Sequence, residues 1–136
     1  MSEKTANTGG AFFAPHLAVR NVLKQMEFCQ RAFGAMELRR WDNPDGSVHV
    51  AELSIGDALF HLHEEVPGKG ELSPLTVKAT TVLMGLFVAD PDALMERAIA
   101  AGGRVVSPMQ PYDYGYRQGV VADPEGHLWL IQKRIS

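Results

Sequence analysis

Three histidines are the residues whose type and spacing could do chemistry. His61 and His63 are two positions apart in a strand-like run, so their side chains share one face of that strand. In an earlier run, His16 shares a face with Ala14 and Ala18. Imidazole can ligate a metal, act as a general base near neutral pH, or hydrogen-bond a ligand or water. No carboxylate occurs on the same strands to orient a ring, which favours hydrogen bonding, and His61 remains the candidate base.

These histidines belong to a pattern of strands and helices that occurs twice. A strand at 15–20 leads into a helix that Asn21 caps and Gly34 ends. A second helix begins at Asp90-Pro91 and ends at Gly102. The other predicted strands of the first copy are 35–41, 47–55 and 58–63, and those of the second are 81–88, 104–107, 117–122 and 127–132.

The two copies keep a near-constant spacing of 69 residues. Val19 corresponds to Val88 and His61 corresponds to Leu130. The sequence therefore predicts an α+β fold in which two βαβββ repeats form a curved, mixed, eight-stranded sheet with a concave cleft. The predicted organisation is a loose tail at 1–13 and a single domain at 14–136, with repeats at about 14–63 and 81–133 joined by a linker at 64–80.

Composition narrows the classes of function. The chain has 136 residues, of which 46% are hydrophobic, enough for one core without disulfides or metal. Its net charge is -3 and its 13 basic residues are scattered, which argues against nucleic acid as a partner. No apolar run approaches the ~20 residues of a membrane-spanning helix. Because the single cysteine, Cys29, cannot form an internal disulfide, we expect a cytoplasmic protein.

Three motifs carry a resemblance to a known family. The runs Pro-His-Leu-Ala-Val-Arg-Asn at 15–21, Tyr-Gly-Tyr-Arg at 114–117 and Asp-Pro-Glu-Gly-His-Leu-Trp at 123–129 resemble the vicinal oxygen chelate superfamily. This is the glyoxalase, bleomycin-resistance and extradiol-dioxygenase group, and the likeness is closest to its PhnB-like branch. It covers about residues 14–133. The likeness implies a glyoxalase-like fold and a homodimer. It does not imply one activity, because the members of the superfamily include lyases, dioxygenases, thiol transferases and antibiotic-sequestering proteins.

The resemblance also implies four metal-ligand positions, which here are Ala14, His61, Leu83 and Leu130. Alanine and leucine cannot coordinate, and one histidine does not hold a divalent metal. We therefore expect a degenerate metal site, no cofactor and no metal-dependent catalysis. The alternative is a metal-dependent lyase or dioxygenase with relocated ligands, for which His16, His61 and Gln132 are the candidates. A second alternative is a structural or regulatory dimer module.

The side chains predicted to line the cleft suit an apolar or aromatic small molecule. Histidines and an arginine would supply polar contacts, leucines the apolar wall, and aromatic residues the rim. The predicted ligand-binding residues are His16, Arg20, Trp41, Leu59, His61, His63, Phe87, Tyr114, Leu128 and Leu130.

Overall fold

The computed structural model describes residues 10–136. Positions 1–9 of the predicted tail at 1–13 therefore lie outside the described residues. The first repeat contains β1 (His16–Val19), α2 (Val22–Phe33), β2 (Met36–Asp42), β3 (Val48–Ile55) and β4 (Ala58–Glu64). The second contains β5 (Leu83–Phe87), α4 (Pro91–Ala100), β6 (Arg104–Tyr112), β7 (Tyr116–Ala122) and β8 (Leu128–Arg134). The duplicated βαβββ order is confirmed.

The helices begin where their capping residues predict. The Asn21 side chain accepts a hydrogen bond from the Lys24 amide at the start of α2, and Gly34 ends that helix with a φ of 67°. Asp90 caps α4 by accepting from the Ala93 amide, and proline follows at the first helical position.

The eight strands are divided between two four-stranded sheets. The first has the order β1-β4-β3-β2 and the second the order β5-β8-β7-β6. Pairing is parallel between β1 and β4 and between β5 and β8, and antiparallel elsewhere. His16 pairs with His61 in the first sheet, and Gly85 pairs with Leu130 in the second. The spacing of 69 residues is therefore kept in the register of the strands.

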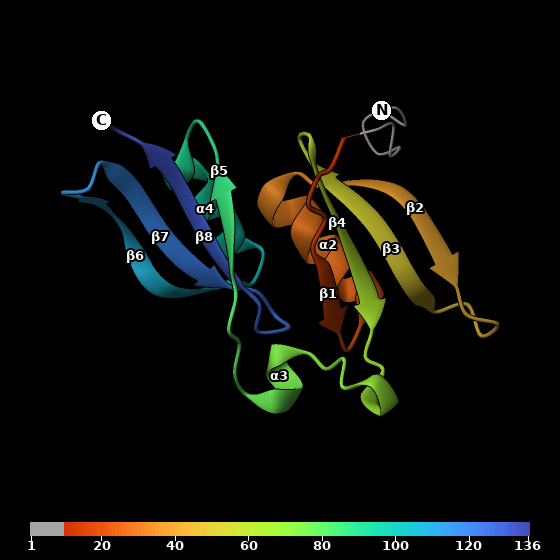
Figure 1. Cartoon of the computed structure of the whole chain (residues 1–136). Coiled ribbons are helices and arrows are strands. Elements are labelled where there is room, and N and C mark those ends of the chain that lie inside the picture. Colours follow the sequence, from red (N-terminus) through yellow and green to blue (C-terminus); the bar gives the residue numbers. More distant parts are fainter. Residues whose placement is uncertain (1–9) are drawn as a thin grey trace.

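One hydrophobic core serves both repeats. Figure 1 shows the sheets side by side, with α2 and α4 behind them and the linker running below from one sheet to the other. The two helices contact each other. Trp129 of β8 packs on Phe33 of α2, with ring centroids 4.6 Å apart, and on Phe60 of β4, at 5.8 Å. An aromatic side chain of the second repeat therefore packs in the core of the first.

Two segments contain more regular structure than the sequence predicts. The linker includes a 3-10 turn at Pro67–Lys69 and a short helix, α3 (Pro74–Val77), capped by Ser73. Strand β6 continues through Pro108 and Pro111, where the sequence predicts a loop after 107. This is possible because β6 lies at the edge of its sheet and its pairing with β7 is irregular there.

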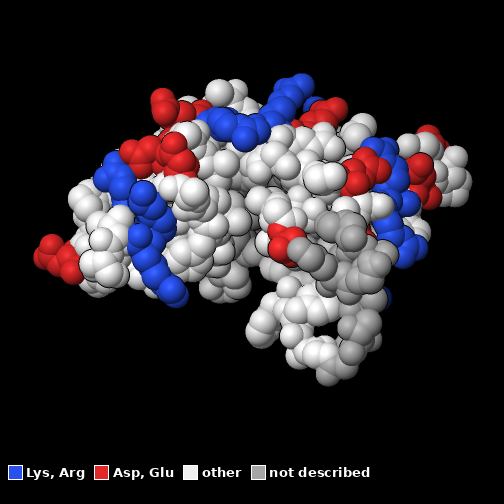
Figure 2. All heavy atoms as spheres, turned by 90° about the horizontal axis from the view of Figure 1, so that it is seen from above, with Lys and Arg blue, Asp and Glu red and all other residues white. Residues whose placement is uncertain are grey.

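Charged side chains of both signs are mixed on one face of the molecule. Lys and Arg are interspersed with Asp and Glu on the face that Figure 2 shows. None of the helices within residues 10–136 is long and apolar enough to cross a membrane.

Candidate functional site

A row of polar side chains crosses the first sheet. Arg39, Glu52, His61 and His16 come from β2, β3, β4 and β1 respectively, and each is the direct neighbour of the next across a strand pair. They occupy the side of the sheet away from α2, which we call its open face, because the alternating positions such as Leu62 are buried in the core. We refer to these four residues as the polar row.

Glu52 and His61 form a close pair in the centre of the row. The His61 Nε2 atom lies 3.0 Å from Glu52 Oε2, and the side chains are only 16% and 15% exposed. A carboxylate can only accept, so the ring proton is held on Nε2. The other ring nitrogen, Nδ1, is buried and has no hydrogen-bond partner among residues 10–136. A neutral ring therefore places a lone pair at that position.

The His16 ring lies flat on the His61 ring. Their centroids are 4.3 Å apart and the ring planes differ by 7°. Burial, together with the neighbouring His61 and His63 rings, lowers the pKa of His16 below its usual 6.5. His16 is therefore mainly neutral at pH 7 and can accept a hydrogen bond.

This pKa shift leads to a first testable expectation. In His61→Gln, the glutamine amide can still donate to Glu52 but cannot become a cation beside His16. The pKa of His16 should rise toward 6.5, although not fully because burial remains the largest cause of its depression. An NMR titration of the imidazole carbon-bound protons measures this. A His49→Gln control should leave the His16 midpoint unchanged, and an equal shift in both variants would contradict the expected coupling.

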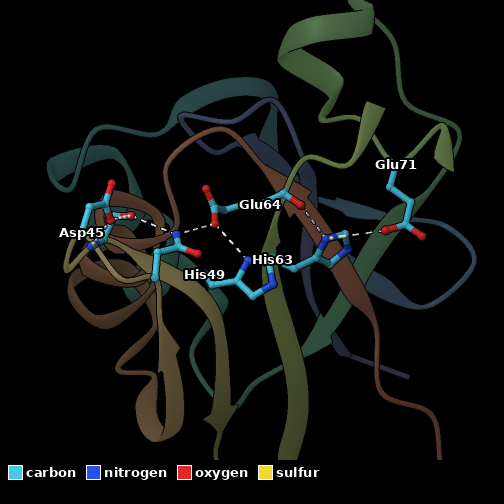
Figure 3. Close-up of polar contacts among 7 residues, drawn as sticks. Asp45, His49, His63, Glu64 and Glu71 are labelled. Atoms are coloured by element: carbon cyan, nitrogen blue, oxygen red, sulfur yellow. Dashed lines mark hydrogen bonds and ion pairs between the residues drawn. The ribbon is translucent and has the colours of Figure 1, made fainter. Parts of the chain in front are cut away.

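His63 is held differently, as Figure 3 shows. Its Nδ1 donates to the backbone carbonyl of Glu64 at 2.9 Å and lies 3.9 Å from Glu71 Oε1. The side chain of Glu64 instead lies 2.9 Å from His49 Nδ1. The His49–Glu64 pair resembles the Glu52–His61 pair but is more exposed, so it is a natural comparison for it.

His16 and His63 line a pocket of about 560 Å³ between the first sheet, the linker and the start of β5. We call it the junction pocket. His127, at the start of the last strand run, also lines it, and its Nε2 donates to the Ala18 carbonyl at 2.8 Å. Most of the remaining lining is apolar, with the charged Glu71 at one side: Pro15, Leu17, Leu72, Pro74, Val77, Val82 and Met84.

The other predicted residues of the first repeat lie around this site in different roles. Leu59 lines a separate pocket of about 290 Å³ beside Trp129. Trp41 lies on the open face, with the Arg39 guanidinium 4.7 Å from its ring centroid. Arg20 points to the linker, where its Nε donates to Thr76 Oγ1.

The predicted residues of the second repeat do not reach the junction pocket of the same chain. Leu128 and Leu130 belong to β8 in the second sheet, and neither lines that pocket. Phe87 is 53% exposed and packs edge-on against Tyr116, while Tyr114 is 64% exposed. Gln132, the third candidate for a relocated metal site, accepts instead from Gln118 Nε2.

Glu52 is the residue that sequence reasoning missed. A search limited to the strands of the histidines finds no carboxylate, because Glu52 is on the neighbouring strand. The signal was nevertheless present: the tight turn at Gly56-Asp57 pairs Ile55 with Ala58, and counting outward places Glu52 opposite His61.

Asp123 also has a wider role than the turn that the sequence predicts. It is 5% exposed. Its carboxylate accepts from Gln25 Nε2 at 2.7 Å, from Trp129 Nε1 at 2.8 Å, and from the amides of Glu125 and His127 at 2.9 and 3.0 Å. Asp123 therefore ties the last hairpin to α2 of the first repeat.

Comparison with known proteins identifies the family. The family model described as the Glyoxalase/Bleomycin resistance protein/Dioxygenase superfamily matches residues 11–131. The chain belongs to this superfamily. An uncharacterized protein of Mycobacterium bovis is 39% identical over 125 residues, covering 90% of this chain and 82% of that protein. A lactoylglutathione lyase of Neisseria meningitidis is 28% identical, covering 87% of each chain. The crystal structure of TioX from Micromonospora sp. ML1 matches with a TM-score of 0.72 and 29% identity, covering 92% of this chain and 99% of TioX.

Within this superfamily, the resemblance assigns ligand positions to Ala14, His61, Leu83 and Leu130. His61 is the single potential ligand, and its Nε2 is engaged by Glu52. In the part of the chain that the structure describes, no three His, Cys, Asp or Glu side chains are grouped to hold a metal ion. The residues present therefore do not fit a divalent metal.

Proposed function

We propose that this protein binds an apolar or aromatic small molecule on the open face of its first sheet and does so without a metal. The observation that carries the proposal is the junction pocket, where His16 and His63 face a mainly apolar wall in a space of about 560 Å³. This volume is typical of small-molecule sites, as is an apolar lining with few polar groups. The degenerate ligand positions support binding in place of metal chemistry.

We also propose that the protein acts as a homodimer. Large apolar side chains on the open faces remain exposed in a single chain, among them Met36, Leu83, Phe87 and Tyr114. Exposed patches of this kind usually mark an interface. A second copy whose second sheet covers the first sheet of its partner would bring Leu128, Leu130, Phe87 and Tyr114 to the ligand site. Assignment to the PhnB-like branch and a cytoplasmic location stay predictions.

A ligand screen tests the proposed binding. In a thermal-shift screen of aromatic and apolar compounds, a ligand at 100 times its Kd should add about 2.7 kcal/mol to the free energy of unfolding and raise Tm. The same compound should have little effect on Thr81→Trp, in which an indole enters the junction pocket from its exposed edge. If no compound in a broad screen raises Tm, the alternative of a structural or regulatory dimer module is favoured.

Metal analysis separates the proposal from the lyase or dioxygenase alternative. The similarity to a lactoylglutathione lyase is the observation that favours this alternative. After dialysis, the purified protein should carry far less than one equivalent of Zn, Ni, Mn or Fe. A stoichiometric metal that is lost in His61→Ala would overturn the proposed metal-independent function.

A further inference from the structure

We infer that the junction pocket selects ligands that carry a neutral, weakly acidic hydroxyl group, such as a phenol or an enol, and that His16 accepts the hydrogen bond from this hydroxyl. The inference rests on the proposed function, since it names the class of small molecule for the same pocket. It also assigns His61 and Glu52 as positioning residues for His16.

His16 is the histidine of the junction pocket with neither ring nitrogen engaged by a residue within 10–136, whereas His63 and His127 each have one nitrogen engaged and could accept only at the other. His63 directs its Nδ1 proton to the Glu64 carbonyl, and His127 directs its Nε2 proton to the Ala18 carbonyl. Neither ring nitrogen of His16 hydrogen-bonds to a residue within 10–136, and the ring lines the pocket. It is mainly neutral, so one of its nitrogens has a lone pair to offer.

The orientation of His16 is set by the polar row. Its ring stacks on His61 within 7° of parallel, and His61 is held by Glu52 at 3.0 Å. Three strands therefore fix the plane of an exposed imidazole that would otherwise rotate freely. When a ligand shares its proton with His16, the Glu52 carboxylate on the far side of the stack stabilises the positive charge that develops.

The charge of the lining favours a neutral donor over an anion. The residues that line the junction pocket include no Lys or Arg, and their one carboxylate belongs to Glu71. A phosphate or carboxylate ligand would have no cation to pair with there. A hydroxyl attached to an apolar or aromatic body matches both the free acceptor and the wall formed by Leu72, Val77, Val82 and Met84.

A matched pair of ligands tests the inference. The probes are 4-cyanophenol and its methyl ether, 4-methoxybenzonitrile, which share the aromatic body and differ in the hydroxyl proton. At neutral pH, ligand-observed NMR titration of the full chain should show about fivefold tighter binding of the phenol, the ratio that one net hydrogen bond supplies. In His16→Phe, which keeps a ring on His61 but has no nitrogen, the two probes should bind equally.

Two further variants separate positioning from general structural effects. Glu52→Gln should reduce the preference for the phenol while leaving binding of the ether unchanged. The ¹⁵N resonances of His61 should show its proton mainly on Nε2 in the wild type and distributed over both nitrogens in Glu52→Gln. His49→Gln, which removes the imidazole from the comparable His49–Glu64 pair outside the pocket, should keep the wild-type preference.

Each contrary result has a distinct meaning. Equal binding of both probes to the wild type overturns the inference but leaves the proposed aromatic site standing. A preference for the phenol that survives in His16→Phe overturns the role of His16. An unchanged His61 tautomer in Glu52→Gln overturns the positioning role of Glu52. If neither probe binds, the inference fails, and the proposed function then depends on the ligand screen alone.

Discussion

Replacing Asp123 by alanine should lower the free energy of unfolding by about 4 kcal/mol, because four N–H donors lose a shared buried acceptor. Two of these donors, on Gln25 and Trp129, lie inside the core, where water cannot readily replace the carboxylate. Urea denaturation followed by circular dichroism should show a lower midpoint with an unchanged slope.

The first hairpin of the chain provides the control. Asn43-Pro44-Asp45-Gly46 forms the same kind of turn as Asp123-Pro124-Glu125-Gly126, and the two glycines have φ values of 89° and 88°. The Asn43 side chain is partly exposed and, within residues 10–136, hydrogen-bonds to Ser47 and Glu64 alone, so Asn43→Ala should cost no more than about 1 kcal/mol. Similar losses in the two variants would show that Asp123 acts only as a turn residue.

Replacing Glu125 by alanine should cost about 3 kcal/mol and loosen the start of α2. Its two carboxylate oxygens accept from the backbone amides of Arg20 and Asn21, at 2.8 and 3.0 Å. Glu125 is 6% exposed, so its removal takes a buried charged acceptor away from two partly buried amide bonds. Hydrogen exchange of the amides of residues 20 and 21 should accelerate together with the loss of global stability.

The second helix again supplies a comparison within the molecule. Asp90, which is 69 positions after Asn21, caps α4 at the surface, and the hydrogen bonds found within residues 10–136 bring no carboxylate of the first repeat to its backbone amide. Asp90→Ala should cost about 1 kcal/mol, the usual value for an exposed cap. If Glu125→Ala costs no more than Asp90→Ala, the contact between the last hairpin and α2 contributes little.

Much of the fold could be predicted from sequence because the signals were local or periodic. Asn21, Gly34 and Asp90-Pro91 mark helix ends through backbone chemistry that does not depend on the rest of the chain. The repeat of 69 residues then predicts the strands of one copy from those of the other. What could not be predicted was the division into two sheets, since no local residue pattern states whether two edge strands such as β1 and β5 pair.

The candidate site was predictable only within each repeat. Period-2 alternation correctly places His16, His61 and His63 on one face. The sequence does not state which side chains meet across strands, so Glu52 was missed and the stacking of His16 on His61 was not expected. The leucines and aromatics of the second sheet need a partner surface that a single chain does not provide, so their role stays a prediction.

The Asp123 contacts have a consequence for how this duplicated chain can change over time. The two halves kept nearly the same backbone pattern, yet Gln25 of one half and Asp123 and Trp129 of the other form a single hydrogen-bonded unit. A substitution accepted in one half therefore depends on the residues of the other. A change at Gln25 or Asp123 alone would leave a buried polar group without its partner, so we expect it to require a matching change in the other half.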